Sequence, residues 1–125
     1  MAVGDIYRIF VRFGLDTLGE KERYAVEIGK AHFTIALLDS ITSQYKEKLD
    51  FIKLQYYPIR DWRQAGLQKS SYIDICSTMS FDFLEILKGG KYIGQLSHTD
   101  VIELAQFIQS YKERLKVYLK AHPTE

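Results

Sequence analysis

The chain has 125 residues, of which 46% are hydrophobic and 26% are charged, and its formal net charge is +1. These values are typical of an ordinary globular protein, and we expect a single domain over residues 1–125. They exclude a collagen-like chain, a disordered tail and a strongly cationic nucleic-acid binder.

The sequence gives no indication of a membrane span, a metal site or a cofactor site. It has no run of about 18 apolar residues, so we expect no membrane segment. Cys76 is the single cysteine, which excludes an internal disulfide, and no spacing of His, Cys and carboxylate residues supports zinc. The first five residues lack the basic and apolar regions of a secretory signal peptide, and we therefore expect the cytoplasm.

The first third of the chain is typical of strands. Residues 6–13 are dense in Ile, Phe, Tyr and Val, and a polar stretch over 15–22 predicts a long hairpin loop. Residues 23–28 alternate as a second strand, which we expect to end in a two-residue turn at Gly29-Lys30. The nearly continuous apolar run of 31–41 then predicts a central strand covered on both faces.

The rest of the chain predicts shorter strands and a long helix. In order, we expect a strand over 49–57, an irregular segment around Trp62, a strand over 71–77, a short helix capped by Ser80, a strand over 91–95 and a helix from Ser97 to about 122. Together these elements predict an α+β fold, in which the long C-terminal amphipathic helix packs on a twisted antiparallel sheet of five to seven strands.

Several short motifs appear in a characteristic order along the chain. They are Gly4-Asp5-Ile6-Tyr7, Arg23 opening the second strand, Ile41-Thr42-Ser43 ending the third, Gly66-Leu67-Gln68-Lys69 and Ile93-Gly94-Gln95-Leu96-Ser97. In this order they resemble the PemK/MazF-type toxins, small ribonucleases that are paired with antitoxins. The resemblance implies that the sheet curls into an SH3-like barrel, that the chain is a homodimer, and that its partners are single-stranded RNA and a cognate antitoxin.

The resemblance also implies a catalytic pair, Arg23 and Thr42, for metal-independent cleavage of RNA. The guanidinium of Arg23 would stabilise the charge that develops on the phosphorane, and the hydroxyl of Thr42 would orient the scissile phosphate. Ser40 is the fallback for Thr42 if the end of the strand is misplaced by two residues. The sequence does not settle which group accepts the 2′-hydroxyl proton.

Four further residues are candidates for RNA binding. Arg8, Arg12 and Lys21 could contact phosphates, although they could equally be solvated charges at the edge of the sheet. Trp62 lies between Arg60 and Arg63 and could stack on a base, or it could anchor a loop on the core.

Two observations keep a second function open. Residues 74–79 contain no arginine where the family often carries one, and residues 45–65 are longer and more aromatic than the family suggests. The alternative is a non-catalytic toxin-like or regulatory protein on the same fold, for example a CcdB-like inhibitor of gyrase.

The predicted turn at Gly29-Lys30 separates the proposed catalytic pair. In that register Arg23 faces Ala36, and Thr42 lies roughly 20 Å further along at about 3.3 Å per residue. The two side chains can then meet only if the third strand bends, or if a bulge shifts the register.

Overall fold

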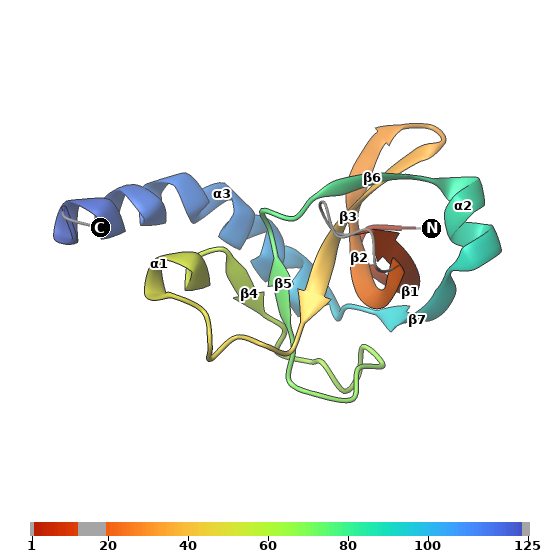
Figure 1. Ribbon diagram of the computed structural model, residues 1–125, viewed down its shortest axis with the longest axis horizontal. Helices are drawn as coiled ribbons and strands as arrows, with labels where there is room; N and C mark the ends of the chain where they lie inside the picture. The colour runs from red at the N-terminus through yellow and green to blue at the C-terminus, as the bar shows by residue number, and fades with distance from the viewer. Residues whose placement is uncertain (1, 13–19, 124–125) are drawn as a thin grey trace.

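The computed structural model describes residues 2–12 and 20–123, which form an α+β fold. Its elements in chain order are β1 (Asp5–Arg12), β2 (Glu20–His32), β3 (Ile35–Thr42), α1 (Asp50–Lys53), β4 (Tyr56–Pro58), β5 (Tyr72–Asp74), β6 (Met79–Asp82), α2 (Phe83–Gly89), β7 (Lys91–Gln95) and α3 (His98–Ala121). Helix α3 begins against the body of the molecule and extends well past the sheet (Figure 1).

One antiparallel sheet holds all seven of these strands. Its order is β4-β5-β3-β2-β1-β7, and β6 pairs with β3 beside β5. The prediction of an antiparallel sheet of five to seven strands with a long C-terminal helix is therefore confirmed. This order has two ends, β4 and β7, and the described strands do not close into a barrel. The SH3-like barrel stays a prediction.

The β2–β3 hairpin differs from its predicted form. Strand β2 continues through Gly29 and Lys30 as far as His32, and the turn lies at Phe33 and Thr34. The predicted two-residue turn was wrong because the glycine does not adopt the positive φ that would favour a turn there. Instead, the register shifts between Glu27 and Gly29 and again between Lys30 and His32, so that β2 carries extra residues relative to β3.

The segment over 49–57 is not the single strand that its apolar residues predict. Residues 50–53 form the short helix α1, and only Tyr56–Pro58 pairs with β5. Leu49 and Phe51 are exposed rather than buried in a sheet, since this segment leaves the end of β3 and crosses beneath α3 (Figure 1).

The region after β5 also differs in detail from the prediction. Ser80 lies in strand β6 and does not cap a helix. Helix α2 begins three residues later, and its N-cap is Asp82, whose carboxylate accepts a hydrogen bond from the N–H of Leu84 at 2.8 Å. The predicted strand over 91–95 is confirmed as β7. Cys76, the single cysteine, is exposed.

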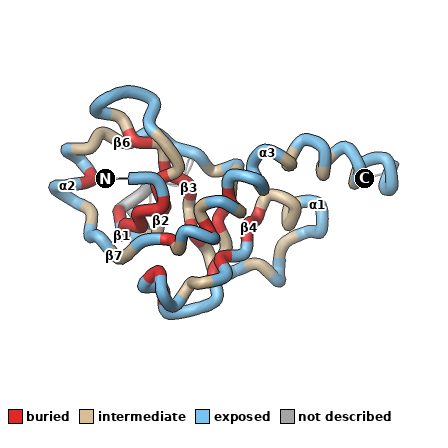
Figure 2. The backbone as a smooth tube through the Cα atoms, turned by 180° about the vertical axis from the view of Figure 1, so that it is seen from behind, coloured by how far each residue is buried: buried red, intermediate tan, exposed pale blue. Residues whose placement is uncertain are grey.

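Two clusters of buried side chains stabilise the two faces of the sheet (Figure 2). The larger lies between the sheet, the start of α3 and the segment over 59–67, and it includes Ile6, Val26, Ile73 and Leu104. The smaller cluster lies beneath α2 and includes Ile9, Leu38 and Ile86. The alternation of Ala25 and Val26 between the two clusters shows that both faces of β2 are covered.

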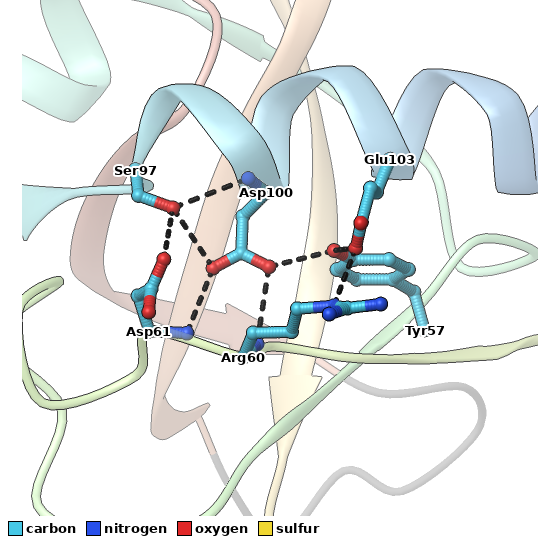
Figure 3. A network of polar contacts seen from close by, with 6 residues as sticks. All are labelled: Tyr57, Arg60, Asp61, Ser97, Asp100 and Glu103. Carbon is cyan, nitrogen blue, oxygen red and sulfur yellow. Dashed lines mark hydrogen bonds and ion pairs between the residues drawn. The ribbon is translucent and has the colours of Figure 1, made fainter.

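The N-terminus of α3 is held by a buried carboxylate (Figure 3). Asp100 is fully buried and accepts hydrogen bonds from the hydroxyl of Tyr57 at 2.6 Å and from the backbone N–H groups of Arg60 and Asp61 at 3.0 and 2.9 Å. The predicted cap is also present, because the hydroxyl of Ser97 accepts a bond from the N–H of Asp100 at 3.1 Å. Both oxygens of this carboxylate are therefore engaged, and the network fixes α3 against the strand β4 and the loop after it.

Candidate functional site

A hollow of about 530 Å³ opens where β2 begins and β3 ends. Three segments line it: the start of β2, the end of β3 with the residues that follow it, and the loop before β5. The lining residues are Glu22, Arg23, Tyr24, Ile41, Thr42, Ser43, Gln44, Leu67, Gln68, Lys69 and Ser71. We call this hollow the strand-end pocket.

Arg23 and Thr42 both line the strand-end pocket. Ala25 pairs with Ser40 in the β2–β3 ladder, and the same register carried two residues outward brings Arg23 opposite Thr42. Directly opposed residues of an antiparallel pair project from the same face of the sheet. The separation of roughly 20 Å that follows from a turn at Gly29-Lys30 is therefore wrong, because the turn lies further along the chain and two bulges shift the register.

The hydroxyl of Thr42 takes part in a local turn. Its Oγ1 accepts a hydrogen bond from the backbone N–H of Gln44 at 3.1 Å. This bond fixes the side chain at the mouth of the pocket, and because the hydroxyl is the acceptor it keeps its own hydrogen to donate.

Ser40, the fallback residue, is placed differently. Its hydroxyl donates to the hydroxyl of Ser77 at 3.0 Å, and its backbone N–H donates to the same oxygen at 2.9 Å. Ser77 therefore bonds to β3 between the residues that pair with β6 and the residues that pair with β5. Ser40 and Arg23 both line a second, small and nearly apolar hollow beneath β6, whereas Ser40 does not line the strand-end pocket.

Arg8 projects from the other face of the sheet. It pairs with Tyr24 across β1 and β2, its guanidinium lies 5.7 Å from the centre of the Tyr24 ring, and its Nε lies 2.9 Å from Oε1 of Glu22. Glu22 and Tyr24 both line the strand-end pocket, so Arg8 contacts two lining residues without lining the pocket itself.

The remaining candidates for RNA binding do not add to the pocket. The side chains of Arg12 and Lys21 lie outside what the structure describes. Trp62 is half-buried against the larger core cluster, with the Arg63 guanidinium 4.8 Å from its ring centre, and it does not line the pocket. This position corresponds to the anchoring alternative for the tryptophan.

Several polar residues of the pocket were not singled out by the sequence, among them Glu22, Gln44 and Lys69. Lys69 follows Gly66, whose φ of +91° and close approach to the backbone of Ile93 leave little room for any other residue. The glycine thus lets its loop pack closely against β7. The sequence signal that could have pointed to Lys69 was the motif Gly66-Leu67-Gln68-Lys69. The signal for Glu22 was weaker, since it lay in a loop that we expected to precede the strand.

Two buried carboxyl groups lie in strands β2 and β3 of the sheet. Asp39 is fully buried, and one of its oxygens accepts a bond from the Thr78 hydroxyl while the other has no partner among the described residues. Burial is the main cause that raises the pKa of Asp39 to about 6, and the nearby Asp74 adds to it. Burial likewise raises the pKa of Glu27, whose carboxylate oxygens also lack a described partner.

The described residues hold no group of three or more His, Cys, Asp and Glu side chains that could bind a metal ion. The three histidines are exposed, and His32 closes β2 at the tip of the hairpin rather than opening the third strand as expected. Over residues 2–12 and 20–123, none of the helices has the length and apolar character needed to cross a membrane.

Comparison with known proteins assigns no family to this chain. No protein-family model matches it, and no curated protein matches it. The arrangement of the strand-end pocket is therefore the main observation on which a function can be based.

Proposed function

We propose that this protein is a metal-independent, sequence-selective endoribonuclease of the PemK/MazF type, which cleaves single-stranded RNA as the growth-inhibiting toxin of a toxin–antitoxin pair. The observation that carries the proposal is the meeting of Arg23 and Thr42 in one pocket. The motifs of the sequence imply the same two residues as a catalytic pair, although a turn at Gly29-Lys30 would have kept them roughly 20 Å apart.

The chemistry needs three groups. The 2′-hydroxyl must lose a proton as it attacks the adjacent phosphorus, the negative charge on the phosphorane must be stabilised, and the departing 5′-oxygen must gain a proton. The guanidinium of Arg23 suits the second task, because its donors match phosphate oxygens in pairs. The hydroxyl of Thr42 donates to a non-bridging oxygen and so fixes the phosphate beside Arg23.

Glu22 is the residue that we assign to the proton transfer from the 2′-hydroxyl. It is the single carboxylate among the residues that line the strand-end pocket, and its Oε1 lies 2.9 Å from Nε of Arg8, which projects from the same face of the sheet. An arginine cannot accept this proton, because its pKa lies above about 12. Lys69, which lines the same pocket, adds a positive charge that attracts the RNA backbone, and its ammonium is the group that we assign to protonate the departing 5′-oxygen.

The proposal includes the partners and the closed sheet that the resemblance implies. An acidic segment of a cognate antitoxin would occupy the strand-end pocket and mimic RNA phosphates on Arg23 and Lys69. A homodimer is proposed through the exposed part of α3. The third strand is the weaker candidate for this interface, since β2 covers one edge of β3 and both β5 and β6 pair with the other. The SH3-like barrel would require β4 and β7 to be brought together.

The test is cleavage of a long single-stranded RNA by purified protein in the presence of a chelator. Arg23→Ala and Thr42→Ala should each abolish cleavage while changing the free energy of unfolding by less than about 1 kcal/mol, because neither side chain is part of the core. An acidic antitoxin segment should compete with RNA for the wild type and should bind Arg23→Ala more weakly.

Two variants serve as controls for this test. Ser40→Ala should retain cleavage, since Ser40 bonds to Ser77 outside the pocket. Arg63→Ala, which removes an exposed arginine beside Trp62, should also retain it. Full cleavage by both Arg23→Ala and Thr42→Ala would end the assignment of the reaction to this pocket. A wild type that cleaves no RNA would favour the non-catalytic alternative.

A further inference from the structure

Three tyrosines form a cluster immediately after β3. The rings of Tyr45 and Tyr72 are stacked, with centres 4.2 Å apart and an angle of 13° between their planes. Tyr56 meets Tyr45 edge-on at 6.2 Å and 70°. Tyr45 and Tyr72 are only half-buried, so the stack is not part of the closed core.

The cluster adjoins the strand-end pocket on the side of β5. Tyr45 follows Gln44 directly, and Tyr72 follows Ser71, and both preceding residues line the pocket. Tyr72 also pairs with Thr42 across β3 and β5, which places the two side chains on the same face of the sheet. The stacked rings therefore lie beside the proposed catalytic threonine, with Tyr72 directly opposite it and Tyr45 three residues further along the chain.

Lysine side chains cover the rings. Nζ of Lys53 lies 5.2 Å from the centre of the Tyr45 ring, and Nζ of Lys48 lies 5.9 Å from that of Tyr56. Because Tyr72 fills one face of Tyr45, the Lys53 ammonium lies over the other face. Lys53 comes near Asp50 only at 3.9 Å, a weak contact, and its side chain is 28% exposed.

Resting on the proposed function, we infer that Tyr45 and Lys53 form a nucleotide subsite beside the scissile phosphate. The base of the neighbouring nucleotide takes the place of the Lys53 ammonium on Tyr45 and adds a third layer to the stack. The displaced ammonium then pairs with the phosphate of that nucleotide. Stacking on tyrosine accepts any base, so this subsite contributes affinity and position rather than sequence selectivity.

The experiment measures binding and cleavage separately. A short single-stranded RNA carries 2-aminopurine at successive positions, with a 2′-deoxy nucleotide at the cleaved position so that it is bound without being cut. The wild type should quench the fluorescence at one position next to the cleaved phosphate. Tyr45→Leu should remove this quenching and raise the Kd about tenfold, whereas Tyr45→Phe should retain both.

A double-mutant cycle, in which one change is made in the protein and the other in the RNA, separates loss of stacking on Tyr45 from a general effect of the substitution on folding. An abasic nucleotide at the quenched position should weaken binding by the wild type about tenfold and should not weaken Tyr45→Leu further. Lys53→Gln should reduce the slope of log Kd against log salt concentration by about the amount expected for the loss of one phosphate contact. Tyr92→Leu is the matched control, because Tyr92 is an exposed tyrosine on β7 at the other end of the sheet, and its Kd should be unchanged.

The possible results are distinguishable. If the wild type cleaves RNA and Tyr45→Leu binds it with unchanged Kd, the subsite is overturned and the proposed function stands. If binding depends on Tyr45 but no RNA is cleaved, the subsite stands and the ribonuclease proposal is overturned. If the wild type neither binds nor cleaves RNA, both are overturned.

Discussion

Asp39 is a carboxyl group that the fold buries with one oxygen lacking a hydrogen-bond partner among the described residues. Its neighbours in the sheet are Val26 on β2 and the Thr78 hydroxyl, with the Asp74 carboxylate on β5 as the nearby charge. Because none of these supplies a positive charge, burial makes Asp39 harder to ionise in the folded protein than in the unfolded chain.

We predict a pH-dependent stability from this residue. The pKa of Asp39 is about 6 in the folded protein, against 3.8 for a free side chain. Between about pH 4 and pH 6, Asp39 is ionised in the unfolded chain but still protonated in the folded protein. Rising pH therefore lowers the free energy of unfolding over this range. Above about pH 6 both forms are ionised and this loss is complete.

Asp39→Asn provides the comparison. Its free energy of unfolding, measured by urea denaturation from pH 4 to pH 7, should lack the part of the decrease due to Asp39, about 1–3 kcal/mol. The difference between wild type and variant isolates Asp39 from the second buried carboxyl group, Glu27, which both proteins contain. Parallel curves for the two proteins would contradict the raised pKa.

At the scale of elements, the strongest local signals predicted best. The helical spacing after Ser97 and the cap at that residue gave α3 nearly to its ends. The β2–β3 turn was misplaced because a glycine followed by a lysine is a common local turn signal, whereas here the bulges and the pairing with β3 decide the conformation. Arg23 and Thr42 could be selected from motifs, but their meeting depends on that pairing and could not be read from the sequence.

The anchor of α3 leads to a prediction on stability. Asp100→Ala should lower the free energy of unfolding by about 2–4 kcal/mol, because it leaves the Tyr57 hydroxyl and the N–H groups of Arg60 and Asp61 without their acceptor. Thermal or urea denaturation would measure this loss.

Glu113→Ala is the control for the anchor. It removes a carboxylate of α3 whose contact with Lys116 is exposed, and its effect should stay within about 0.5 kcal/mol. Equal stability of the two variants would mean that the network around Asp100 does not hold the helix in solution.

At the scale of the whole molecule, the second half of α3 packs only partly against the rest of the chain. Only Asp100 and Leu104 are buried in this 24-residue helix, and Val117 remains 68% exposed. Beyond Leu104, which packs in the larger core cluster, the residues at 108, 111, 115 and 118 continue the spacing of a helix-packing seam. In Figure 1 this part of α3 extends beyond the sheet, so a second copy could pack its own helix there.

We predict that Leu115→Lys weakens the proposed homodimer. A charged side chain in the seam would have to be desolvated between two helices, so light scattering at micromolar concentration should shift from twice the 14.6 kDa of one chain toward a single chain. Gln109→Lys, an exposed change on the same helix outside the seam, should leave the mass of the dimer unchanged. A wild type that scatters as one chain would contradict the proposal.

The bulges in β2 have a consequence for how this chain can change in length. Side chains alternate between the two faces of a strand, so the loss of one residue between the tip of the hairpin and Arg23 would turn Arg23 to the opposite face. Thr42 would not follow, because β5 and β6 hold β3 from its other side. For a protein with the proposed function, insertions and deletions in this hairpin are therefore tolerable in its turn but not in its strands. The need to keep Arg23 opposite Thr42 thus fixes the number of residues in the two strands of the hairpin.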